Sequence, residues 1–158
     1  MQRLPYETLV PLGMKALGSV YMYVAQCGLE KPLTDLAYLR ASQINGCAYC
    51  IDAHAHDLLK AGASINKLML VSVWREAGSY FSDRERAALA WAECVTQVAS
   101  THIEDADYDA ALAIFGEEAL ADLTIAIGLI NTYNRIAISF RKTPQSLHDL
   151  VADSPTDS

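Results

Sequence analysis

Apolar residues recur along most of the chain at intervals of three and four, the spacing that gathers them on one face of an α-helix. Alternation bounded by hairpin turns, the pattern typical of strands, is hard to find. Proline, glycine and capping residues divide the pattern into predicted helices near residues 11–26, 32–43, 45–62, 64–74, 82–100, 104–116 and 116–140. The pattern therefore predicts an all-α fold, a compact bundle of about six to seven helices.

The clearest helix boundary is the stretch SDRE, in which Ser82 and Glu85 form a capping box ahead of an amphipathic segment. Helical periodicity continues to about Val151 and then gives way to polar residues. We therefore predict a single helical domain over residues 1–150 and a disordered tail over residues 151–158.

Composition adds two expectations about partners. Apolar residues make up 52% of the 158 positions, which is more apolar surface than a monomer of this size easily hides, so we expect self-association. Lysine and arginine number 12 against 19 aspartates and glutamates, and a net charge of −7 offers no broad surface for a phosphate backbone. Nucleic acid is therefore not an expected partner.

The most apolar segment, LTIAIGLINTYNRIAISF, is interrupted by polar residues that include Asn131, Asn134 and Arg135, so we expect no membrane span. Polar side chains in so apolar a helix need hydrogen-bond partners, and we expect these in subunit contacts rather than in a pocket. The N-terminus lacks the basic run, apolar stretch and cleavage site of a signal peptide, which predicts a cytoplasmic protein.

The stretch INGCAYCIDAHAHDLLKAG holds four residues of distinctive chemistry, namely Cys47, Cys50, His54 and His56. A helix turns by about 100° per residue, so Cys47, Cys50 and His54 share one face and His56 lies on the opposite face. A closed zinc site needs four converging ligands, and this helix offers at most three. Zinc would need a remote ligand such as His102 or Asp35, so we expect no metal.

A redox role and a packing role both remain open from the spacing alone. Thiols at positions i and i+3 of a helix lie about 5 to 6 Å apart at Cβ, so the pair could form a strained and easily reduced disulfide. A helix start and a neighbouring histidine both lower the pKa of a thiol, which favours reactivity. Alternatively, the two cysteines and the histidine only pack on an apolar face with Ile51 and Leu58.

The flanking residues are more specific than the spacing. The segment LTDLAYLRASQINGCAYCIDAHAHDLLKAG resembles the signature of the AhpD-like alkylhydroperoxidases, within the carboxymuconolactone decarboxylase family, through its LR, S, Q, NGC, YC and H positions. Weaker similarity in VWREAGSYFSDRERAALAWAE and INTYNRIAI extends the resemblance from about Leu33 to Ile138. The resemblance implies a small all-α bundle that assembles into homotrimers or homohexamers.

For function, the resemblance implies a dithiol peroxidase that reduces alkyl or hydrogen peroxides with a CxxC pair, a histidine, and a glutamate twelve residues before the first cysteine. Cys47, Cys50 and His54 match this pattern, whereas Asp35 stands at the glutamate position. Asp35 is one methylene shorter, so we expect its proton relay to His54 to use an extra water or to be weaker. Tyr49 stands where some members of the family carry a histidine.

The predicted catalytic residues are therefore Cys50, Cys47, His54 and Asp35, with no cofactor. We expect Cys50 to attack the peroxide because His54 lies one turn away, although the helix dipole favours Cys47. Cys47 would then resolve the sulfenic acid to a disulfide. The expected partners are a hydroperoxide and an unidentified dithiol reductant or carrier protein. The alternatives are a disulfide reductase, a decarboxylase-type enzyme on the same fold, and a non-catalytic or zinc-binding helical oligomer.

Overall fold

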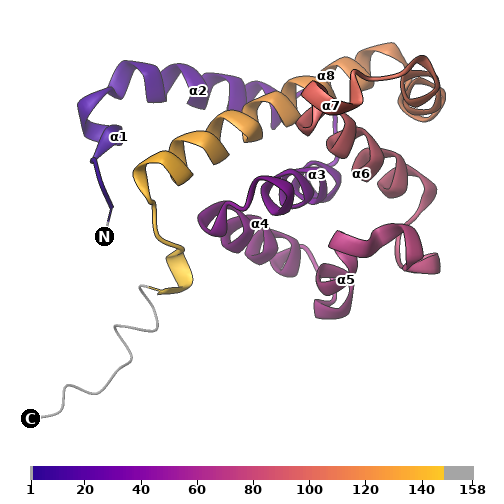
Figure 1. The fold of residues 1–158 in the computed structure, drawn as a ribbon, viewed down its shortest axis with the longest axis horizontal. Coiled ribbons are helices and arrows are strands. Elements are labelled where there is room, and N and C mark those ends of the chain that lie inside the picture. Colours follow the sequence, from indigo (N-terminus) through magenta and orange to yellow (C-terminus); the bar gives the residue numbers. More distant parts are fainter. Residues whose placement is uncertain (1, 148–158) are drawn as a thin grey trace, which may run out of the picture.

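The computed structural model describes residues 2–147, and this part of the chain is helical and contains no strand (Figure 1). Its helices are α1 (Tyr6–Leu9), α2 (Pro11–Val24), α3 (Lys31–Asn45), α4 (Ala48–Lys60), α5 (Ile65–Leu70), η1 (Val71–Glu76), η2 (Gly78–Tyr80), α6 (Asp83–Thr96), α7 (Val98–Thr101) and α8 (Asp105–Phe140). The all-α prediction is confirmed. The predicted tail at 151–158 lies outside the described residues.

Helix α3 occupies the centre of the molecule and packs against α4, α6 and α8 (Figure 1). One side of α3 contributes Leu36 to a core cluster with Leu89 of α6. Another side contributes Tyr38 to a second cluster, which includes Cys47 and Cys50. Because apolar side chains cover α3 on several sides, the helix is the fixed support on which the cysteine-bearing helix α4 rests.

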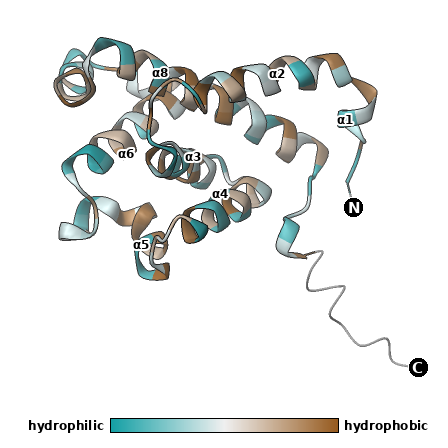
Figure 2. Cartoon of the chain, turned by 180° about the vertical axis from the view of Figure 1, so that it is seen from behind, coloured by the Kyte–Doolittle hydropathy of each residue, from teal (hydrophilic) through white to brown (hydrophobic). Residues whose placement is uncertain are grey.

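The N-terminal helices α1 and α2 lie beside α8 (Figure 1), and Figure 2 shows hydrophobic residues on both α2 and α8. Two contacts there connect the N-terminal residues to the end of α8. The backbone N–H of Arg3 donates to the carbonyl of Phe140 at 2.8 Å, and the rings of Tyr6 and Phe140 pack with centroids 5.3 Å apart. The arm formed by α1 and α2 is therefore anchored to the end of α8.

The range of α8 covers the two segments that were predicted as separate helices, 104–116 and 116–140, and these segments meet at a kink. A break remains at Gly116, where φ is 73° and ψ is 173°, a conformation that is costly for any residue with a Cβ. Figure 1 shows the first part of α8 running in a different direction from the rest. Gly116 thus ends the first helical segment and redirects the chain, as predicted.

The predicted helix starts agree with the structure where capping chemistry was clear. Pro11 opens α2, and the reciprocal capping box of Ser82 and Glu85 is present at the start of α6. Two predicted helices are each divided: 64–74 into α5 and η1, and 82–100 into α6 and α7. Among residues 2–147, no helix is both long enough and apolar enough to cross a bilayer.

Candidate dithiol site

A tight turn between α3 and α4 carries the first cysteine. Gly46 adopts a left-handed conformation with φ of 71°, its N–H bonds to the carbonyl of Gln43, and the N–H of Cys47 bonds to the carbonyl of Ser42. This pair of bonds is the Schellman motif that ends many helices. Cys47 is at once the N-cap of α4, and its Sγ accepts the N–H of Cys50 at 3.4 Å. Gly46 alone therefore lies between the end of α3 and Cys47, the first cysteine of the pair.

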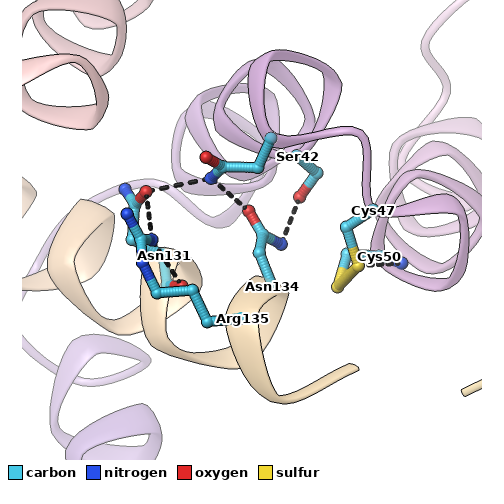
Figure 3. Close-up of a disulfide and its surroundings, with 7 residues drawn as sticks. Ser42, Cys47, Cys50, Asn131, Asn134 and Arg135 are labelled. Carbon is cyan, nitrogen blue, oxygen red and sulfur yellow. Dashed lines mark hydrogen bonds between the residues drawn. A yellow bond between two sulfur atoms is a disulfide. The ribbon is translucent and has the colours of Figure 1, made fainter. Parts of the chain in front are cut away.

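Cys47 and Cys50 are joined as a disulfide, with Cα atoms 5.4 Å apart (Figure 3). Both residues are buried: Cys47 is 1% exposed and Cys50 is 3% exposed. They differ in what they face, because Cys50 lines a cleft with a volume of about 340 Å³ and Cys47 does not. A molecule in the cleft would therefore meet Cys50 first.

The cleft lies between the α1–α2 arm, α4 and α8. Four of its lining residues are tyrosines, namely Tyr6, Tyr21, Tyr49 and Tyr133. Lys142 lies over the ring of Tyr49, with its Nζ 4.4 Å from the ring centroid, and pairs with the carboxylate of Glu7 at 2.7 Å. The walls are thus largely aromatic, and the one lysine among the lining residues is already neutralised by a carboxylate.

Helices α3 and α4 face each other with two matching rows of functional side chains. Both rows have the spacing i, i+4, i+7, which puts three side chains on one face of a helix. The rows are Lys31, Asp35 and Tyr38 on α3, and Cys50, His54 and Asp57 on α4. Because α3 and α4 are joined by a short turn and run back along each other, Lys31 meets Asp57 and Asp35 meets His54.

His54 lies between Asp35 and Tyr38. Its Nδ1 is 3.5 Å from Oδ1 of Asp35, a long distance for a hydrogen bond, and this buried nitrogen has no closer partner among the described residues. The ring of Tyr38 packs against the imidazole with centroids 4.9 Å apart. His54 and Cys50 line the same cleft. The histidine is therefore oriented by an aromatic ring and a carboxylate, within the cavity that Cys50 also faces.

Asp35 is charged although it is buried. Burial by itself would raise the pKa of the Asp35 carboxyl, but its interactions with the neighbouring His54 and Lys31 outweigh burial and hold that pKa below its ordinary value. Lys31 Nζ lies 2.5 Å from Oδ2 of Asp35 and 3.1 Å from Oδ2 of Asp57. The site thus contains a carboxylate shared between a lysine and a histidine.

A metal ion is conceivable from the donor set alone, since ligand atoms of Asp35, His54 and Asp57 lie within 4.8 Å of one another. However, the ammonium group of Lys31 already bonds both carboxylates and supplies their positive partner. His56, on the other face of α4, is half-exposed and places Nδ1 2.9 Å from the carbonyl oxygen of Asp52. The site residues are therefore better suited to proton transfer than to holding an ion.

A buried network of polar side chains ties α3 to α8 beside the disulfide (Figure 3). Asn134 donates to the hydroxyl of Ser42 at 3.0 Å, and Asn45 donates to the side-chain oxygens of Asn134 and Asn131 at 2.8 and 2.9 Å. Arg135 donates to the side-chain oxygen of Asn131 at 3.0 Å. The prediction of subunit contacts is wrong for Asn131 and Asn134, because both find partners within the chain once α8 packs on the end of α3.

Three neighbours of the predicted site residues were missed by the sequence reasoning. Lys31 and Tyr38 lie four residues before and three residues after Asp35, and Asp57 lies three residues after His54. The same helical spacing that grouped Cys50 with His54 would have placed them on the correct faces. What the spacing could not provide was the pairing of the two faces, which depends on the turn at Gly46.

Comparison with known proteins places the chain in a family. The carboxymuconolactone decarboxylase family matches residues 11–93. Protein YdfG of Bacillus subtilis, which is uncharacterised, is 34% identical over 138 residues, covering 87% of this chain and 93% of that protein. The alkyl hydroperoxide reductase AhpD of Coxiella burnetii is 46% identical over 48 residues, which are 30% of this chain and 27% of that protein.

Solved structures share the fold. A protein of unknown function from Agrobacterium tumefaciens, described as a candidate antioxidant defence protein AhpD, is 40% identical, with a TM-score of 0.87 over 91% of this chain and 98% of that one. The debrominase Bmp8 is 20% identical with a TM-score of 0.74 over 87% of this chain and 74% of that one, a likeness of fold alone. This chain is an AhpD-like member of the carboxymuconolactone decarboxylase family.

Proposed function

We propose that the protein is a dithiol peroxidase that reduces an organic hydroperoxide or hydrogen peroxide with Cys47 and Cys50. The observation that carries the proposal is a pair of cysteines at disulfide distance, one of them facing a cleft that His54 also lines. In the net reaction a hydroperoxide and two thiols give an alcohol, water and a disulfide. An external dithiol returns the pair to its reduced form by thiol–disulfide exchange.

Cys50 is the attacking residue in this proposal and Cys47 the resolving one. The Cys50 thiolate attacks the terminal oxygen of the peroxide, the O–O bond breaks, and the departing alkoxide takes the proton that His54 had accepted from the thiol. The Cys47 thiol then attacks the sulfenic acid on Cys50, which forms the disulfide and releases water. The assignment is supported by Cys50 facing the cleft while Cys47 does not.

His54 and Asp35 act as the proton-handling pair. The Asp35 carboxylate lies beside His54 Nδ1, and the Tyr38 ring fixes the orientation of the imidazole. The 3.5 Å between Asp35 Oδ1 and His54 Nδ1 leaves room for the contact to shorten when the histidine becomes charged. The shorter side chain of aspartate is therefore compatible with the role that the family assigns to glutamate.

The cleft favours organic hydroperoxides over hydrogen peroxide. Four tyrosine rings and the side chains of Met14 and Ile130 offer apolar and aromatic contact to a substituent on the peroxide. Hydrogen peroxide carries no such substituent and gains nothing from these walls. We therefore expect the larger substrate to react with the higher apparent second-order rate constant.

Assembly into a homotrimer or homohexamer is part of the proposal. The α1–α2 arm exposes large apolar side chains, with Leu12 80% exposed and Leu9, Val10 and Met22 more than half exposed. Contact between copies would remove this surface from water. Sedimentation equilibrium of the wild-type protein and of Leu12→Lys tests it, since the substitution should lower the mass toward that of one chain.

The peroxidase proposal is tested by stopped-flow measurement of thiol loss after reduced protein is mixed with hydrogen peroxide or cumene hydroperoxide. The wild-type protein should lose two thiols per chain, whereas Cys47→Ser should stop at a sulfenic acid on Cys50. Cys50→Ser should react slowly and His54→Ala more slowly than wild type by roughly 10²-fold. The matched control is Cys94→Ser, a half-buried cysteine outside the site. Oxidation no faster than that of a free thiol would sink the proposal, and decarboxylase substrates would be tested next.

A further inference from the structure

Lys31 is an exposed residue on the first turn of α3, yet it touches the centre of the candidate site. We propose that Lys31 is a positioning residue: by holding one oxygen of Asp35, it limits how strongly this carboxylate binds protonated His54. In peroxide reduction, Lys31 would thereby set the pH at which Cys50 becomes reactive, and this part rests on the function proposed above. The effect of Lys31 on His54 does not depend on that function.

The two oxygens of the Asp35 carboxylate have different partners. Oδ2 lies 2.5 Å from the Lys31 ammonium, and Oδ1 lies 3.5 Å from Nδ1 of His54. Asp57 Oδ2 holds the same ammonium from the α4 side at 3.1 Å. Because Asp57 and His54 lie on one face of α4, the Asp57 carboxylate keeps Lys31 close to Asp35, the partner of His54.

Charge explains why this sharing matters. A carboxylate paired only with an imidazole favours the protonated ring, because an opposite charge within about 6 Å stabilises the charged form. The ammonium on the other oxygen offsets that effect, and it does so strongly here because the side chain of Asp35 is only 5% exposed. Removing the Lys31 charge should therefore leave the full negative charge of Asp35 to act on His54.

Other groups around His54 complete its electrostatic surroundings. The pair Glu7–Lys142 also lines the cleft, and each of these side chains balances the charge of the other. The titratable and charged side chains that contact His54, bind its partner Asp35 or line the same cleft are Lys31, Asp35, Tyr38, Cys50, Asp57, Tyr6, Glu7, Tyr21, Tyr49, Tyr133 and Lys142. Lys142 is paired with Glu7, whereas Lys31 is paired with Asp35, the partner of His54, so loss of the Lys31 charge bears most directly on the histidine.

Substitution of Lys31 is mild for the fold. Its side chain is 62% exposed, so Lys31→Gln removes the charge without opening a cavity in the core. Lys31→Arg keeps the charge and serves as the conservative control. Asp35→Asn removes the carboxylate charge with little change in size, and the double variant Lys31→Gln with Asp35→Asn shows whether the lysine acts through Asp35.

The experiment is an NMR pH titration of the ¹³C-histidine-labelled, reduced full-length protein, with the His54 resonance assigned by its loss in His54→Gln. Lys31→Gln should raise the titration midpoint of His54 by roughly one pH unit, whereas Lys31→Arg should leave it within about 0.3 units. In the Asp35→Asn background the same substitution should move the midpoint by less than about a third as much.

Two results would overturn the proposal: a midpoint that does not move in Lys31→Gln, or an equal movement with and without the Asp35 charge. A second measurement follows alkylation of Cys50 by iodoacetamide against pH in the Cys47→Ser background. The midpoint of Cys50 reactivity should move in Lys31→Gln and return in Lys31→Arg, which a merely structural role would not produce. Neither assay contains peroxide. Failure of peroxide reduction would therefore count against the proposed function, while a fixed His54 midpoint would count against the role of Lys31.

Discussion

Replacement of Asn134 by alanine should be among the most destabilising single changes near the dithiol. Its side chain is fully buried and makes two hydrogen bonds, donating to Ser42 at 3.0 Å and accepting from Asn45 at 2.8 Å. Each bond contributes about 0.5–1.5 kcal/mol, and a buried hydroxyl left without its donor costs about 1–3 kcal/mol more. Asn45 keeps its bond to Asn131, so that amide is not orphaned. The expected loss is therefore about 3 kcal/mol of the free energy of unfolding.

Urea unfolding of the oxidised protein, followed by far-ultraviolet circular dichroism at one protein concentration, measures this loss. Thr132→Ala is the matched control on the same helix, because Thr132 is exposed and its hydroxyl donates to the carbonyl of Gly128 one turn earlier. The control should change stability by less than about 0.5 kcal/mol. A reversible two-state transition in which Asn134→Ala costs under about 1 kcal/mol, with an unchanged m-value, would refute the reasoning.

Four further variants test the turn and the surroundings of His54. Gly46→Ala should destabilise the protein by about 1 kcal/mol, because alanine is strained at φ of 71°. Gly13→Ala, inside α2 where an added Cβ would meet no other atom within 4 Å, should instead stabilise the protein by up to about 1 kcal/mol. The urea midpoints of the two variants, compared with that of the wild-type protein, test both expectations. Tyr38→Phe should raise the melting temperature, because the Tyr38 hydroxyl is buried without a hydrogen-bond partner among residues 2–147; a fall of several degrees would show that the hydroxyl is bonded. The pKa of Asp35 is lowered in the folded state, so its contribution to stability is present above its unfolded pKa and disappears as the pH falls through the folded value. Asp35→Asn should therefore flatten the loss of stability in acid, below about pH 4, and an unchanged acid slope would contradict this.

Local chemistry explains why much of the fold could be predicted. Pro11, Ser64 and Ser82 mark helix starts whatever packs nearby. Proline lacks the N–H group that would be unpaired at this position, and a serine side-chain oxygen accepts from one of the unpaired N–H groups. Gly116 was expected to end a helix, since glycine permits a conformation that other residues avoid. The structure confirms this expectation, because Gly116 has non-helical backbone angles and the helical segments on its two sides meet at a kink within α8.

The predicted site residues are all near one another, but their environment could not be read from the sequence. Spacing along α4 put Cys50 and His54 on one face, and the family resemblance supplied Asp35 as their partner. Whether Asp35 reaches His54 directly, which cysteine faces the cleft, and what else binds the carboxylate depend on how α3 meets α4. The participation of Lys31 and Asp57 follows from the antiparallel pairing of the two helices.

The sequence by itself determined the all-α class, most helix starts, the family, and the CxxC motif with its histidine, because periodicity, capping and short motifs are properties of neighbouring residues. Only the tertiary structure decided that Asn131 and Asn134 bond within the chain, that Cys47 is buried behind Cys50, and that one carboxylate serves both Lys31 and His54. The contacts that carry these facts join residues far apart in the sequence, 19 positions for Asp35 and His54 and 92 for Ser42 and Asn134, and such contacts are set by the packing of whole helices rather than by local preference.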